Sequence, residues 1–79
     1  MATLPTPAEK GRMILDIYQH FNSKAGHALR GNNFIAVATQ FNASSDDIAD
    51  GLEYAYSQGW VEDGPNDSVR LTDAGFAAM

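Results

Sequence analysis

The chain lacks cysteine and has few basic residues. None of its 79 residues is a cysteine, which excludes disulfides, thiolate metal sites and cysteine nucleophiles. Five residues are Lys or Arg and ten are Asp or Glu, so the net charge is -5. Phosphate backbones and anionic lipid attract basic proteins. The composition therefore disfavours nucleic acid and membrane as partners, and it favours a basic protein surface or simple solubility.

Long apolar runs are also missing. No stretch of the sequence approaches the roughly 18 apolar residues that a membrane span needs. Residues 1–7 show no basic patch followed by an apolar segment, which a secretory signal would require. We therefore expect no membrane insertion and a cytoplasmic location. The Asn-X-Ser sequences at 42–44 and 66–68 are then expected to be turn and cap residues rather than glycosylation sites.

What is present predicts one small folded domain. Hydrophobic residues make up 44% of the chain and charged residues 19%, which is typical of a folded domain rather than a disordered tail. We expect a single domain over 1–79, with 1–6 flexible, and too little room for a substrate cleft. His20 and His27 have no carboxylate at a ligand spacing. No metal, cofactor or enzymatic activity is predicted.

The first helix has a clear start. Thr6-Pro7-Ala8-Glu9 is a capping box with proline at the first helical position. We expect this helix to run until Gly26. An apolar stripe at helical spacing predicts its buried face, and polar residues fall outside that stripe. The predicted core residues are Met13, Ile14, Ile17, Tyr18 and Phe21, and the predicted outer residues are Arg12, Asp16, Gln19 and Ser23.

The middle of the chain is less distinctive. Residues 27–30 are expected to form a short extended link in which Leu29 makes at most a single strand pair. Residues 34–41 fit both helical and strand periodicity. We favour a helix, because Asn33 is a good cap and Ala36 and Ala38 are helix formers. A tight turn would join it to the next helix as a helix-turn-helix.

The third helix is predicted over 44–58, from the cap Ser44 to the stop at Gly59. Its predicted core face holds Ile48, Leu52, Ala55 and Tyr56, beside Gly51, which permits close approach of another element. Its outer face carries Asp46, Asp50, Glu53 and Ser57, flanked by Tyr54. No Lys or Arg within this helix is placed to neutralise these carboxylates.

A hairpin follows, with strands at 60–62 and 68–71 around a turn-rich loop at 63–67. Thr72 should cap a last helical turn over 73–79, from which Phe76 can reach the core. The predicted fold class is mainly α with a small β-hairpin (α+β), built from three helices and the hairpin.

The run Ile48-x3-Leu52-x6-Gly59-Trp60-Val61, followed by a polar loop and Val69-Arg70-Leu71-Thr72-x2-Gly75, resembles the winged helix-turn-helix family, in particular its bacterial regulators. The resemblance implies that helix 44–58 enters a major groove and that the hairpin 60–71 is a wing against the DNA backbone. The positions that it implies for nucleic-acid contact are Ser45, Tyr54, Ser57, Asn66 and Arg70, together with Asp46, Asp50 and Glu53.

The charges at these positions oppose that function. DNA-binding proteins neutralise roughly 6 to 10 phosphates with Lys and Arg, and from residue 46 onward this chain has one basic residue, Arg70, against eight acidic ones. The other basic residues, Lys10, Arg12, Lys24 and Arg30, precede the helix-turn-helix. They are interpreted as a solvated face, with a non-standard nucleic-acid contact through the first helix as the alternative.

Two functions of different classes remain. The favoured one is a non-enzymatic protein-interaction or regulatory module, in which Asp46, Asp50, Glu53, Tyr54 and Ser57 meet a basic partner, a second copy or the chain's own basic first helix. The alternative is a DNA-binding transcriptional regulator that uses helix 44–58 and the wing 60–71.

Overall fold

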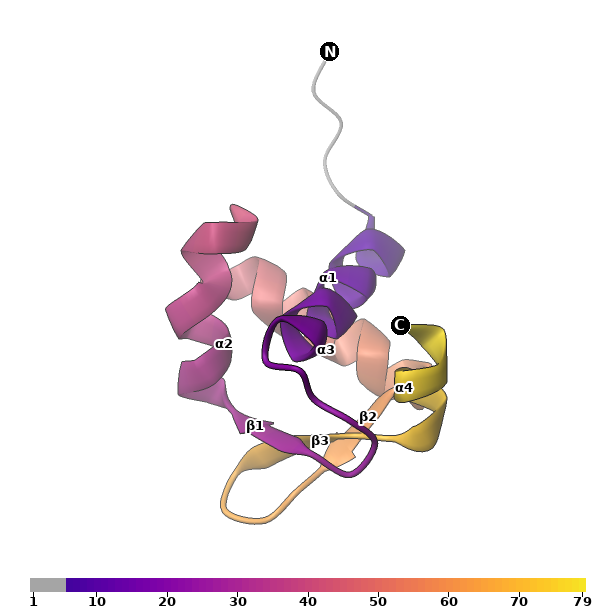
Figure 1. The fold of residues 1–79 in the computed structure, drawn as a ribbon. Helices are drawn as coiled ribbons and strands as arrows, with labels where there is room; N and C mark the ends of the chain where they lie inside the picture. Colours follow the sequence, from indigo (N-terminus) through magenta and orange to yellow (C-terminus); the bar gives the residue numbers. More distant parts are fainter. Residues whose placement is uncertain (1–5) are drawn as a thin grey trace.

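The computed structural model describes residues 6–79 and has four α-helices and three strands in that range (Figure 1). The strands form one antiparallel sheet in the order β1-β3-β2, so the predicted α+β class is confirmed. The elements follow the chain as α1 (Pro7–His20), β1 (Ala28–Arg30), α2 (Gly31–Ala38), the 3-10 helix η1 (Thr39–Phe41), α3 (Ser45–Ser57), β2 (Val61–Asp63), β3 (Ser68–Leu71) and α4 (Asp73–Ala78).

Helix α1 begins where the capping box predicts and ends earlier than expected. The Thr6 hydroxyl accepts from the Glu9 amide at 3.2 Å, and the Glu9 carboxylate accepts from the Thr6 amide at 3.3 Å. The expected flexibility of 1–6 lies outside the described residues except at Thr6, which caps α1. The stop at Gly26 is wrong, because Asn22 already adopts a left-handed φ of 55° just beyond Phe21, the C-cap.

The core is centred on α1. Ile14, Ile17 and Tyr18 are fully buried as predicted, together with Leu15. Two predicted positions are wrong: Phe21 is 37% exposed and Ser23 is buried. Both errors follow from the early end of α1, because residues beyond His20 no longer keep the helical period. The remaining buried apolar residues are Phe34, Val37, Ala38, Ile48, Ala55, Val61 and Leu71.

Residues 28–38 form a strand followed directly by a helix. The helical prediction for this region is confirmed, but Asn33 is not the N-cap. The helix begins at Gly31, and the Asn33 side chain instead accepts from the Arg30 amide at 3.0 Å. The strand at Leu29 is longer than expected, because Ala28–Arg30 pairs with three residues of β3. This pairing turns the predicted two-stranded hairpin into a three-stranded sheet.

Helix α3 crosses α1 at close range. Its cap is confirmed, since the Ser44 hydroxyl accepts from the Asp47 amide at 3.1 Å. A side chain at Gly51 would place its Cβ 2.5 Å from the Lys10 carbonyl oxygen and 2.9 Å from Ile14 Cγ1. Gly51 therefore permits the close approach that the sequence predicts. Tyr56 is an error, because it is exposed rather than part of the core.

The hairpin and the last helix complete the fold. Strands β2 and β3 pair in the register Val61 with Leu71, and the turn between them uses two left-handed residues, Asn66 and Asp67. The Thr72 hydroxyl accepts from the Gly75 amide at 3.0 Å and caps α4. Phe76 does not reach the core, since it is 46% exposed. The partly buried hydrophobic residues of this end that pack against the core are Ala78 and Met79.

The sequence predicts no membrane-spanning segment. Within residues 6–79, none of the helices is both long and apolar enough to span a bilayer.

Candidate functional site

A surface groove lies between the start of α1 and the outer face of α3. Its lining consists of Pro7, Asp50, Glu53, Tyr54 and Ser57. The fold thus brings together four of the five residues predicted for protein interaction. Asp46, the fifth, lies exposed in the first turn of α3 and does not line the groove.

Tyr54 forms a rigid wall of this groove. Its ring packs edge-to-face on Trp60, with the ring centroids 5.6 Å apart and the planes at 67°. The ring also lies close to Gly11 of α1, where an added Cβ would lie 3.1 Å from Tyr54 Cγ. The residue is half-buried. A tyrosine held by two neighbours loses little rotamer freedom when a ligand covers it.

One carboxylate of the groove is neutralised from within the molecule. Lys10 Nζ on α1 lies 2.9 Å from Asp50 Oδ2 and 3.3 Å from Asp47 Oδ1. The hydrogen bond to Asp50 is the main cause that raises the pKa of Lys10. The pKa of Asp47 is lowered, chiefly by the Ser44 backbone amide and next by Lys10. The chain's own first helix thus supplies a cation to α3.

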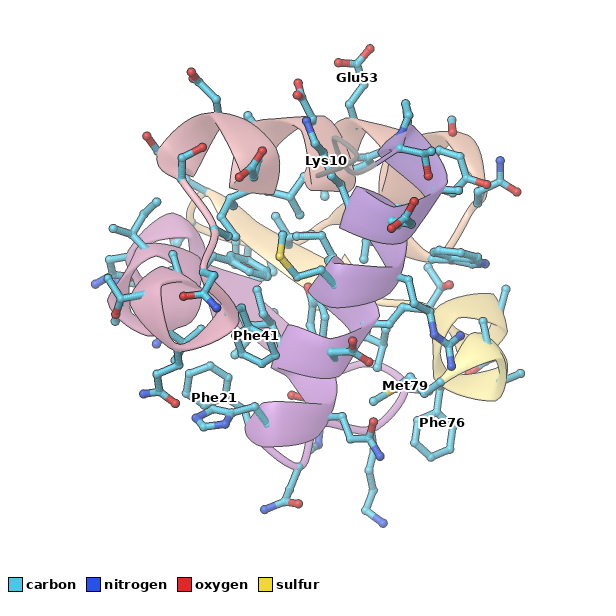
Figure 2. All side chains as sticks on the ribbon, turned by 90° about the horizontal axis from the view of Figure 1, so that it is seen from above. Lys10, Phe21, Phe41, Glu53, Phe76 and Met79 are labelled. Carbon is cyan, nitrogen blue, oxygen red and sulfur yellow. The ribbon has the colours of Figure 1, made fainter. Side chains whose placement is uncertain are left out.

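The remaining outer carboxylates of α3 lack such a partner. Within residues 6–79, no ion pair involves Asp46 or Glu53. Glu53 points away from the body of the molecule in Figure 2, on the side of Lys10. Glu53 is exposed and lines the groove, so it adds negative potential there.

Two serines of α3 have local roles. The Ser57 hydroxyl donates to the Tyr54 carbonyl at 2.6 Å, which adds a second hydrogen bond to an oxygen that also accepts from the Gln58 amide. Ser45 is exposed at the first helical position and is not part of the groove. Only Ser57 of this pair contributes to the site.

The hairpin residues implied for nucleic-acid contact lie apart from the groove lining. Asn66 is an exposed turn residue with φ of 55°. Arg70 Nε lies 3.8 Å from Glu62 Oε2 across the β2–β3 pair. This nitrogen is buried and has no hydrogen-bond partner. The basic residue of the hairpin is therefore held beside an acidic one, which lowers the net positive charge that it shows to a phosphate.

Neither histidine belongs to a metal-binding cluster. In the part of the chain that the structure describes, no group of three or more His, Asp and Glu residues is placed to hold a metal ion. The His20 ring packs edge-to-face on Phe21 and Phe41, with centroid distances of 5.2 and 6.2 Å. His27 Nδ1 accepts from the Lys24 amide at 3.2 Å. Both histidines thus have structural contacts.

Two participants were missed from the sequence: Pro7 lines the groove and Trp60 supports Tyr54. Lys10, which neutralises Asp50, belongs to the basic first helix that the sequence names as one possible partner of the acidic face. The signal for Pro7 and Lys10 was the close α1–α3 crossing implied by a glycine at 51, to which Gly11 adds a second small residue. A tight crossing places the first turn of α1 beside the middle of α3.

Comparisons of this chain with protein-family models, curated proteins and solved structures return no match. The proposals below therefore depend on the geometry and charge of the groove.

Proposed function

We propose that the chain is a winged-helix-like module that binds a basic segment of another protein in the groove on α3. The order of elements, with two helices, a third helix and then a hairpin, supports the winged-helix part of the proposal. The groove supports the binding part. The single observation that carries it is that one groove is lined by both Tyr54, whose ring packs on Trp60, and Glu53, which has no ion pair within residues 6–79.

The groove chemistry suits a lysine or arginine side chain. The alkyl stem of such a residue can lie between Pro7 and the Tyr54 ring, which are both apolar surfaces. Its charged head can then reach the carboxylate of Glu53. Contact with an aromatic face adds a cation–π attraction of about 0.5 to 1 kcal/mol at an exposed site.

Charge argues against DNA as the ligand of the same surface. A phosphate backbone would meet Asp46, Asp50 and Glu53, and the nearby cation, Lys10, is already engaged by two carboxylates. Each close like-charge contact costs free energy, and it also slows encounter. A basic peptide gains from the same field that repels a duplex.

The test is the affinity of an Arg- and Lys-rich peptide for matched charge variants, measured by calorimetry at low salt. Glu53→Gln removes the unpaired charge of the groove, and Asp46→Asn removes the same charge from the same helix outside it. We expect roughly a three- to tenfold loss for Glu53→Gln, because hydrogen bonds to charged groups contribute about 1 kcal/mol or more. Asp46→Asn should cause a smaller loss. Equal losses of affinity would show that the peptide responds only to the overall negative charge of α3 and not to the groove. No binding by the native chain would refute the proposal.

A further inference from the structure

The outer face of α1 is a second surface with an ordered charge pattern. Glu9, Arg12, Asp16 and Gln19 recur at helical spacing on the side opposite the core, and all four are exposed. Figure 2 shows α1 at the front of the view, with α2 and α4 on its two sides. Within residues 6–79, no ion pair involves Asp16. The face is thus available to a partner.

We propose that this face binds a second copy of the chain, with the two α1 helices antiparallel about a two-fold axis near residue 14. In that arrangement Arg12 of each copy lies opposite Asp16 of the other, because the two residues are equally far from the axis. Two identical ion pairs form, as a two-fold interface requires. A parallel arrangement would instead place Arg12 against Arg12, which is repulsive.

The Arg12 side chain is held beside the end of α4. Its Nη1 donates to the carbonyl oxygen of Ala78 at the end of α4. A guanidinium has five N–H donors, so this bond leaves others free for a carboxylate. Holding the side chain in one place reduces the entropy that is lost on pairing. The same contact brings α4 beside α1.

Exposed apolar side chains flank the C-terminal half of α1. Phe21 lies on the α2 side and Phe76 on the α4 side (Figure 2), and they are 37% and 46% exposed. Burial of apolar surface contributes about 25 cal/mol per Å², and aromatic residues are enriched in interfaces. In an antiparallel pair these rings would lie over the N-terminal half of the partner's α1. A single-helix interface is small, so a weak dimer is expected.

This proposal uses residues other than the α3 groove, so the two can fail independently. Lys10 and Asp50 pair within one chain and take no part in the proposed dimer contact. The outer carboxylate Glu53 lies on α3 and points away from the body of the molecule in Figure 2. Pairing through α1 would leave it exposed to a basic ligand.

The experiment is sedimentation equilibrium on the full chain and on charge-reversal variants, from micromolar to millimolar concentration. Arg12→Asp gives a face with two acidic groups, and Asp16→Arg gives a face with two basic groups. Each variant alone should dimerise roughly tenfold more weakly than the native chain, because two attractive pairs become repulsive. An equimolar mixture should regain a 1:1 heterodimer, in which every 12–16 pair is attractive again. The double variant R12D/D16R should also dimerise.

Arg12→Asp removes the bond to Ala78 as well, so circular dichroism must show that it folds. If Arg12→Asp does not fold, variants at position 16 test the proposal instead. The native chain should dimerise most tightly, Asp16→Asn less tightly and Asp16→Arg least tightly. Salt should weaken the native dimer and strengthen the Asp16→Arg dimer. A native chain that is monomeric at millimolar concentration would overturn the proposal, as would reversal variants that dimerise like the native chain.

Discussion

Lys10 Nζ lies within 3.3 Å of Asp47 and 2.9 Å of Asp50, and thereby joins the first turn of α1 to one turn of α3. The Lys10 side chain is 18% exposed, while that of Asp50 is 55% exposed. A bridge this open to water contributes modestly to stability. Its larger consequence is electrostatic, since Lys10 neutralises Asp50 of the α3 groove, while within residues 6–79 no ion pair involves Glu53.

Replacing this lysine should lower stability in a salt-dependent way. Lys10→Met keeps the apolar stem and leaves Asp47 and Asp50 without their cation. We expect a lower urea midpoint than that of the native chain at low salt, and a smaller difference at high salt, where the charges are screened. Lys24→Met, at an exposed site on which no ion pair is seen in residues 6–79, is the matched control and should change little. An equal effect at both positions would contradict this role of Lys10.

Asp47 should contribute to the loss of folding stability at low pH. Its folded-state pKa is lowered, mainly by the Ser44 backbone amide. Its stabilising contribution is therefore complete above the unfolded-state pKa of about 3.9, and it is lost as the pH falls through the folded-state value. Asp47→Asn should flatten the decline in the free energy of unfolding below about pH 4. A decline as steep as that of the native chain would show that other carboxylates cause it.

Gly51 should not tolerate a side chain. A Cβ at this position would meet the Lys10 carbonyl at 2.5 Å, and a backbone atom can move only if α1 moves with it. Gly51→Ala is therefore expected to destabilise the fold by about 1 to 3 kcal/mol, despite the better helix propensity of alanine. Gly31→Ala, where no atom lies within 4 Å of an added Cβ, is the control. Urea denaturation of both variants measures the difference.

The hydroxyl groups of Tyr18 and Tyr56 should titrate at a higher pH than a free tyrosine. Burial, and then the hydrogen bond to Asp63, raises the pKa of Tyr56 to about 12. Burial also raises the pKa of Tyr18, whose hydroxyl donates to the Val69 carbonyl at 2.5 Å. Both groups hold their protons more tightly when folded, so stability falls as the pH rises above about 10, the unfolded value. Tyr56→Phe should remove the transition near pH 12 from the ultraviolet titration, and its persistence would contradict the assignment.

Much of the fold was predictable because short-range chemistry specifies it. In each of the caps Thr6, Ser44 and Thr72, the side-chain hydroxyl accepts a hydrogen bond from the backbone amide three residues later. All three predicted caps are confirmed. The hairpin was also predictable, because its turn residues tolerate left-handed φ.

The errors have two physical causes, which are a choice between two local helix stops and packing between distant parts of the chain. The end of α1 depends on Asn22 rather than Gly26, and either residue can take a left-handed conformation. The exposure of Phe76 depends on Met79 and Ala78, which fill the space against the core instead. Strand β1 is made by its pairing with β3, so no local pattern indicates its length.

The sequence predicted which α3 residues belong to the candidate site, but it did not predict how α1 completes it. The spacing of Asp50, Glu53 and Tyr54 on one helix face follows from helical periodicity alone. The contributions of Pro7 and Lys10 come from a separate helix, and the angle and depth of the α1–α3 crossing determine them. A single sequence does not specify that crossing.

The most direct measurement is a competition between a basic peptide and a DNA duplex, followed by amide chemical shifts of the labelled chain at low salt. The peptide is expected to shift Tyr54, Glu53, Ser57 and their neighbours, and to change the fluorescence of Trp60, which touches the Tyr54 ring. The duplex is expected to shift none of these residues and to leave the peptide bound. Displacement of the peptide by the duplex, with shifts on α3 and the hairpin, would contradict a groove built for a cationic partner.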